Sequence, residues 1–122
     1  MITRPIKYTK ESLGRPAIFY LPTGMMGLTL ESGRTATEEV DEFLATTFGG
    51  YTEEGGANSG YWRNENGKEY KGTFQRYRVS FKGKDRIEPL MEFLAYIAIQ
   101  LHQESIYLET GEDAWLIYPS YQ

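Results

Sequence analysis

The dipeptide Asn66-Gly67 stands between two segments, 61–63 and 70–81, that have the composition of β-strands. Both residues tolerate a positive φ, so Asn-Gly is the strongest short signal for a two-residue hairpin turn. With this pair at the centre of the turn, Glu65 pairs with Lys68 and Arg63 with Tyr70. Side chains alternate between the two faces of a sheet, so this register predicts which of them lie together.

The predicted register gives the hairpin two different faces. One carries arginine and aromatic side chains, namely Tyr61, Arg63, Tyr70, Phe74, Arg76 and Arg78. The other is apolar and is expected to face the core, with Trp62, Tyr77, Val79 and Phe81. A bulge near Gly72 would break this assignment locally. The preceding stretch 51–60 is rich in glycine and acidic residues, and it is read either as a loop or as the start of a strand.

Two segments have helical patterns. Thr35 and Glu38 form a capping box, in which each side chain bonds the other residue's backbone amide, and Gly49-Gly50 ends that helix. A second helix is expected to start at Asp85, and it is apolar on nearly every side. Such a helix is buried on more than one side, or it packs on another subunit.

The remaining strand signals complete an alternating order of elements. Segments 16–21 and 105–108 read as strands, and 114–118 reads as a final strand, extension or hairpin. The order strand, helix, strand, strand, helix, strand predicts an α+β fold, a ferredoxin-like βαββαβ sandwich with two helices on one face of an antiparallel sheet. We expect one domain over 16–122 and an extended arm over 1–15.

The order and spacing also resemble a family of small uncharacterised bacterial domains. The residues that carry the resemblance are Phe48-Gly49-Gly50, Gly60-Tyr61-Trp62, Asn66-Gly67 and Gln103-Glu104-Ser105. The resemblance implies a ferredoxin-like fold and no established activity. The stretch 51–59 is longer and more acidic than the family pattern.

Composition excludes several classes of function. The chain has 13 Lys and Arg against 17 Asp and Glu, a net charge of −4, whereas nucleic-acid binders usually carry a basic excess. The absence of cysteine excludes disulfides and thiolate sites. No apolar run is long enough for a membrane span, and residues 1–5 lack the apolar core of a signal peptide. We therefore expect a cytoplasmic protein that binds neither membrane nor nucleic acid.

The sequence holds few groups with an obvious catalytic pattern. His102 is the single histidine, and its place near a helix C-terminus favours a surface or capping role. The carboxylate clusters at 38–42 and 53–54 fit a solvated helix face and a loop. No metal-ligand spacing is present, and we expect no cofactor, no metal and no catalytic residue.

The arginine and tyrosine side chains are the best candidate for a binding site. Arginine binds phosphate or carboxylate through its planar fork, and tyrosine rings can stack on a base. The predicted ligand-binding residues are Tyr61, Arg63, Tyr70, Arg76 and Arg78. The alternative is a solvated strand whose arginines pair with nearby glutamates.

Three functions remain open at this stage. The first is non-catalytic binding of a small anionic ligand such as a nucleotide, for example by a phage protein that sequesters a nucleotide immune signal. The second is an acidic interaction or inhibitor module that docks on a basic protein partner. The third is a small enzyme of unknown chemistry, which the scarcity of catalytic groups disfavours. The open sheet face and the apolar second helix also predict a homo-oligomer.

Overall fold

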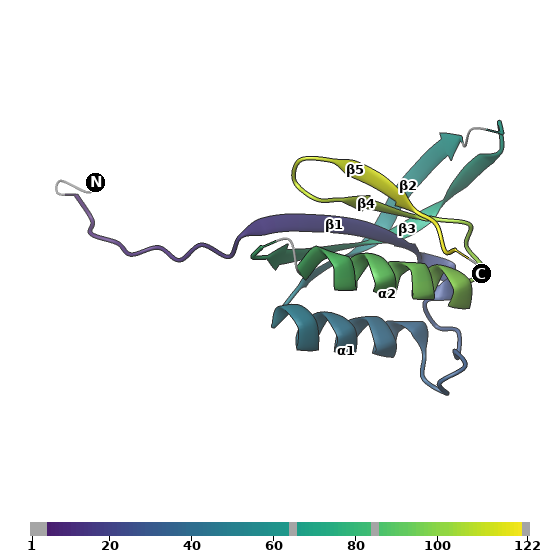
Figure 1. Ribbon diagram of the computed structural model, residues 1–122, viewed down its shortest axis with the longest axis horizontal. Coiled ribbons are helices and arrows are strands. Elements are labelled where there is room, and N and C mark those ends of the chain that lie inside the picture. Colours follow the sequence, from purple (N-terminus) through teal and green to yellow (C-terminus); the bar gives the residue numbers. More distant parts are fainter. Residues whose placement is uncertain (1–4, 64–65, 84–85, 121–122) are drawn as a thin grey trace.

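The computed structural model describes residues 5–63, 66–83 and 86–120, with only the backbone at 55–58, 61, 62 and 70. The elements in chain order are β1 (Arg15–Pro22), the short 3-10 turn η1 (Thr23–Met25), α1 (Ala36–Phe48), β2 (Thr52–Arg63), β3 (Glu69–Phe81), α2 (Ile87–Gln100), β4 (Ile106–Glu109) and β5 (Ala114–Ile117). The strands form an antiparallel sheet in the order β2-β3-β1-β4-β5. Both helices cover the same face of this sheet (Figure 1). The arrangement is a mixed α+β fold that is compatible with the expected ferredoxin-like sandwich, and β5 adds a hairpin to β4.

The core lies between the sheet and the two helices. Phe19 and Tyr77 stack in it with ring centroids 5.1 Å apart, on neighbouring strands β1 and β3. Leu44 of α1 and Leu94 of α2 are fully buried against the same cluster. Every second residue at the end of β3 faces this core: Tyr77, Val79 and Phe81 are buried, as the sequence pattern predicted.

The start of α1 is confirmed in detail. The Thr35 hydroxyl accepts a hydrogen bond from the Glu38 amide at 3.1 Å, and the Glu38 carboxylate accepts one from the Thr35 amide at 3.0 Å. These hydrogen bonds hold the pKa of Glu38 below its usual value. Gly49 ends the helix with φ 78°, a left-handed conformation that glycine adopts without a Cβ clash. The expected start of the second helix at Asp85 lies outside the described residues.

The register of the β2–β3 hairpin differs from the prediction by one residue. Arg63 pairs with Glu69 rather than with Tyr70, and Trp62 pairs with Tyr70. The Arg63 guanidinium lies 2.7 Å from the Glu69 carboxylate, an attractive pair across the two strands. The prediction of a two-residue turn centred on Asn66-Gly67 was therefore wrong. The predicted Glu65–Lys68 pair lies outside the described residues.

Most of the stretch 51–60, which the sequence left open as a loop or a strand, belongs to β2. The bulge that was expected near Gly72 of β3 lies instead in β2, between Glu54 and Asn58. Glu54 pairs with Arg76 and Asn58 with Phe74, so residues 55–57 lie opposite the single residue Gln75. Extra residues on one strand make a bulge that bends and twists the hairpin.

Residues 5–14 form no helix or strand and are exposed throughout. In Figure 1 this segment runs away from the sheet and the helices. It joins β1 at Gly14, whose φ of 88° is left-handed.

Candidate functional site

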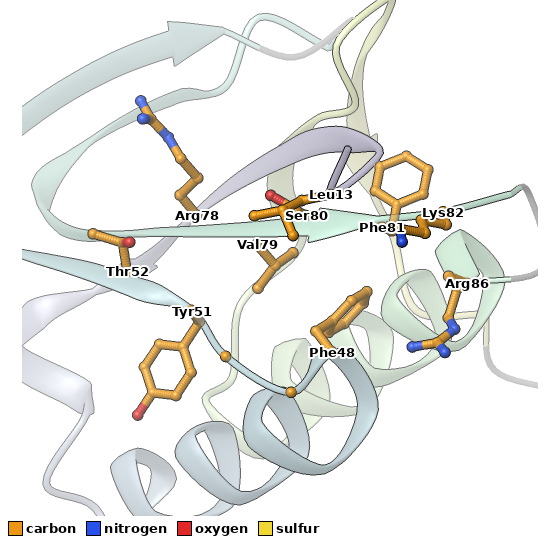
Figure 2. A pocket seen from close by; sticks show the side chains of 12 residues that line it. Leu13, Phe48, Tyr51, Thr52, Arg78, Val79, Ser80, Phe81, Lys82 and Arg86 are labelled. Atoms are coloured by element: carbon orange, nitrogen blue, oxygen red, sulfur yellow. The ribbon is translucent and has the colours of Figure 1, made fainter. Parts of the chain in front are cut away.

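A cavity of about 510 Å³ lies along the edge of β3 that faces β2. Pairing between β2 and β3 reaches only as far as Thr52 with Arg78, whereas β1 pairs with β3 up to Phe81. From Val79 to Phe81 the β2 side of β3 therefore has no strand neighbour among the described residues. The cavity occupies this position, and Figure 2 shows its lining. The lining residues are Leu13, Phe48, Gly49, Gly50, Tyr51, Thr52, Arg78, Val79, Ser80, Phe81, Lys82 and Arg86.

The end of α1 explains why the cavity is there. Gly49 turns the chain out of the helix, and Gly50 carries it toward β2. The chain reaches the sheet only at Thr52, which leaves room between the helix end and the last residues of β3 (Figure 2). The volume lies within the range of about 300–1,000 Å³ that small-molecule sites occupy.

The chemistry of the lining combines rings and positive charge. Phe48, Phe81 and Tyr51 contribute aromatic surface, and Arg78, Lys82 and Arg86 contribute three cations with no carboxylate among the lining residues. This is the composition expected for a ligand that has both a flat apolar part and an anionic group.

The three cations sit at different parts of the rim. Arg78 points to the side of β3 opposite Val79 and Phe48, toward the open sheet face (Figure 2). Arg86 donates a hydrogen bond to the Thr47 carbonyl at the end of α1. That bond orients its guanidinium beside the cavity. Lys82 follows β3 directly and is exposed.

A second group of polar side chains lies next to the cavity, on the helix side of the sheet. Burial of the Tyr51 ring, and then its hydrogen bond with Asp41, raise the pKa of the hydroxyl to about 12. Tyr77 lies beside Tyr51, with ring centroids 6.4 Å apart. Its hydroxyl and Oδ1 of Asp41 are buried and find no hydrogen-bond partner in the described part of the chain. Burial, and then the charge of Asp41, raise the pKa of Glu53 as well.

We expect Glu53→Gln to raise the free energy of unfolding at neutral pH. The raised pKa means that folding favours the protonated carboxyl, so the ionised form lowers stability above its ordinary pKa and has no such effect below it. Urea denaturation should show the variant more stable than the parent at pH 7 and equal to it near pH ~3.5. Glu54→Gln is the matched control, because Glu54 pairs with Arg76 at 2.7 Å and its loss should destabilise at pH 7. A Glu53→Gln gain of equal size at both pH values would contradict this reading.

The structure does not bring the sequence-predicted site residues together on one face. Alternation along β3 places Glu69 on the opposite side from Arg76 and Arg78, and Arg63 lies with Glu69. Arg76 is engaged with Glu54, and hydrogen bonds with that carboxylate and with Tyr20 raise its pKa. Phe74, also predicted on the arginine face, is buried.

The two predicted tyrosines are described only by their backbone positions, where Tyr61 pairs with Lys71 and Tyr70 with Trp62. The one-residue change of register therefore separates the two ends of the predicted face. Arg78 is the single residue of the predicted set that lines the cavity.

Sequence reasoning missed Lys82 and Arg86, and it treated Phe48 and Gly49-Gly50 only as the end of a helix. The sequence did contain one indication of a cationic site, because Lys82 immediately follows a strand that carries Arg76 and Arg78. Nothing local in the sequence indicates that β2 begins too late to cover this edge. His102 lies after α2 with φ 54°, is exposed and does not line the cavity.

Among the described residues, no cluster of histidine and acidic side chains is arranged to hold a metal ion. In the same part of the chain, neither helix has the length and apolar character needed to cross a membrane.

Two solved structures share the fold over almost the whole chain. One is a phage SAM lyase in complex with S-methyl-5'-thioadenosine, with 14% sequence identity, a TM-score of 0.58, and coverage of 97% of this chain and 99% of that chain. The other is a phage SAM lyase in its apo state, with 12% identity, a TM-score of 0.57, and coverage of 96% and 99%. No family model and no curated protein matches the sequence. Identities this low establish similarity of fold alone, and the resemblance to bacterial domains stays a prediction.

Proposed function

We propose that this protein binds a small nucleoside-type ligand that carries an anionic group, in the cavity beside β3. The observation that carries the proposal is the lining itself, in which the described residues join aromatic surface to Arg78, Lys82 and Arg86 and include no carboxylate. A base can stack on the rings, and a phosphate or carboxylate can accept hydrogen bonds from the cations. Arg78 belonged to the predicted ligand-binding set, so part of the sequence-based hypothesis carries over to this site.

The similarity of fold supports the nucleoside part of this proposal. A structurally similar phage protein is described in complex with S-methyl-5'-thioadenosine, which is an adenine nucleoside. A phage protein that sequesters a nucleotide immune signal is one biological form of this proposal. In that form the protein holds the signal without converting it.

Isothermal titration calorimetry with matched ligands tests the proposal. Adenosine and S-methyl-5'-thioadenosine are uncharged nucleosides, whereas AMP and a cyclic di-adenosine nucleotide add phosphate groups to the same nucleoside. We expect AMP to bind more tightly than adenosine by about a hundredfold, because the charge-assisted hydrogen bonds from Arg78 and Lys82 each contribute about 1.5 kcal/mol, the lower end of the usual range, at an exposed site. Equal affinity for AMP and adenosine would contradict the role given to the cations.

A second candidate is an enzyme that acts on S-adenosylmethionine. The observation that favours it is the near-complete coverage of both chains in the comparison with the SAM lyase. Asp41 and Glu53 lie near the cavity through Tyr51, and burial, followed by the charge of Asp41, raises the pKa of Glu53 above its ordinary value, the direction that favours a carboxyl able to hold a proton.

Incubation with S-adenosylmethionine, followed by mass spectrometry, separates the two candidates. Loss of S-adenosylmethionine with appearance of S-methyl-5'-thioadenosine, abolished in Glu53→Gln, would favour the enzyme. Binding without turnover would favour the non-catalytic function.

A further inference from the structure

The arm formed by residues 5–14 exposes apolar side chains that the core does not use. Ile6 is 67% exposed, Tyr8 78% and Leu13 62%. None of the arm residues belongs to the core cluster. Monomeric proteins seldom leave a row of large apolar side chains in water without a partner. The arm also carries Lys7 and Lys10 against the single acidic residue Glu11, so it is basic although the chain as a whole is acidic.

The helical layer has the opposite charge. Neither α1 nor α2 contains Lys or Arg. Together they carry six carboxylates, Glu38, Glu39, Asp41, Glu42, Glu88 and Glu92. Among the described residues, Arg34 pairs with Glu42 on this layer, and Arg86 donates a hydrogen bond to the Thr47 carbonyl at the end of α1. The outer surface of the helices therefore suits a basic segment.

The seam between the two helices offers apolar surface to such a segment. Phe43 of α1 and Phe93 of α2 stack there with ring centroids 4.0 Å apart, and both remain partly exposed. Tyr96 continues the row, 6.1 Å from Phe93, and is 36% exposed. A groove of about 270 Å³ lies beside this pair of rings, with Glu39, Glu42 and Arg34, which pairs with Glu42, on its rim.

The arm and the groove match in spacing as well as in charge. In an extended segment, residues two apart point the same way and lie about 6.6 Å apart, so Ile6 and Tyr8 can contact neighbouring rings of the seam. Lys10 points the same way as Ile6 and Tyr8 and can lie near the carboxylates of the rim, whereas Lys7 points to the other side and adds to the positive charge of the arm. In Figure 1 the arm runs away from both helices, and it does not lie over α1 or α2 of its own chain.

We propose that the arm of one copy of this protein docks in the groove between α1 and α2 of a second copy. Ile6 and Tyr8 of the arm pack on Phe43, Phe93 and Tyr96. Lys10 pairs with Glu39 or Glu42, in competition with the Tyr96 hydroxyl that donates to Glu39 and the Arg34 guanidinium that pairs with Glu42. This contact makes the protein a homo-oligomer through exchanged arms. The docking residues Ile6, Tyr8 and Lys10 do not line the cavity, although Leu13 at the end of the arm does, so the contact holds whether or not the proposed ligand binds there.

Sedimentation velocity over a range of concentrations, in about 50 mM and about 500 mM salt, tests the proposal with four proteins. They are the full chain, Ile6→Ser/Tyr8→Ser, Lys7→Glu/Lys10→Glu and Glu39→Lys/Glu42→Lys. We expect the full chain to associate, more tightly at low salt, and each variant to associate at least ~10-fold more weakly, which corresponds to about 1.4 kcal/mol. Circular dichroism checks folding, and the arm variants lie outside the core, so they stay informative even if the helix variant unfolds.

The decisive measurement uses a mixture of the two charge-reversed variants, Lys7→Glu/Lys10→Glu and Glu39→Lys/Glu42→Lys. An acidic arm fits the basic groove of the other variant, so the mixture should associate although each variant alone does not. The proposal is overturned by a full chain that is monomeric at every concentration. Arm variants that associate like the full chain overturn it too, as does a mixture that stays dissociated while both variants are folded.

Discussion

Gly14→Ala is expected to lower the free energy of unfolding by about 3 kcal/mol. Gly14 has φ 88°, and a Cβ added there would lie 1.9 Å from the carbonyl oxygen of Phe81. Neither atom belongs to a flexible side chain, so the backbone must move. Movement at this point pulls apart the pairing of Arg15 with Phe81, where the arm enters the sheet.

Gly33→Ala is the matched control. Gly33 has a similar φ of 86°, but no described atom lies within 4 Å of the position of its Cβ. It should therefore show only the cost of the left-handed conformation, about 1 kcal/mol. Urea denaturation of both variants measures the difference. Equal losses would mean that the contact with Phe81 does not constrain the start of β1.

Removing the cations of the cavity is expected to weaken ligand binding strongly. Arg78→Ala and Lys82→Ala should each weaken the binding of AMP by about tenfold, and the double variant by about a hundredfold. Both side chains are exposed, so their loss should leave the melting temperature nearly unchanged. The binding of adenosine, which lacks the phosphate, should change little in the same variants.

Lys71→Ala controls for a general effect of charge. Lys71 lies near the tip of the β2–β3 hairpin and does not line the cavity. Its loss changes the net charge as much as the loss of Lys82. Salt should weaken AMP binding to the parent more than binding to the double variant, because salt screens exposed charges. A Lys71→Ala effect as large as that of Lys82→Ala would locate the ligand elsewhere or reduce the effect to long-range attraction.

The local elements could be predicted from sequence because their signals are local. The Thr35 capping box and Gly49 define α1 by hydrogen bonds and a left-handed cap within a few residues. Alternation along β3 likewise predicted the burial of Tyr77 and Val79. Each of these depends on neighbours in the chain, and the order of the elements then limits the sheet to few arrangements.

The hairpin register and the cavity could not be predicted because they depend on distant contacts. The preference of Asn-Gly for a tight turn is small, and the pairing of Arg63 with Glu69 competes with it. The cavity unites segments at 13, 48–52, 78–82 and 86, and it exists because β2 joins the sheet only at Thr52. No pattern within one segment reports where another segment joins the sheet.

Calorimetric titration of the purified full chain with AMP, beside adenosine, tests the ligand-binding role of this cavity most directly. Saturable binding of AMP that is tighter than that of adenosine, and that is lost in the Arg78→Ala/Lys82→Ala variant, is the predicted result. AMP binding that is unchanged in that folded variant, or no measurable heat with any of the nucleosides and nucleotides, would contradict it.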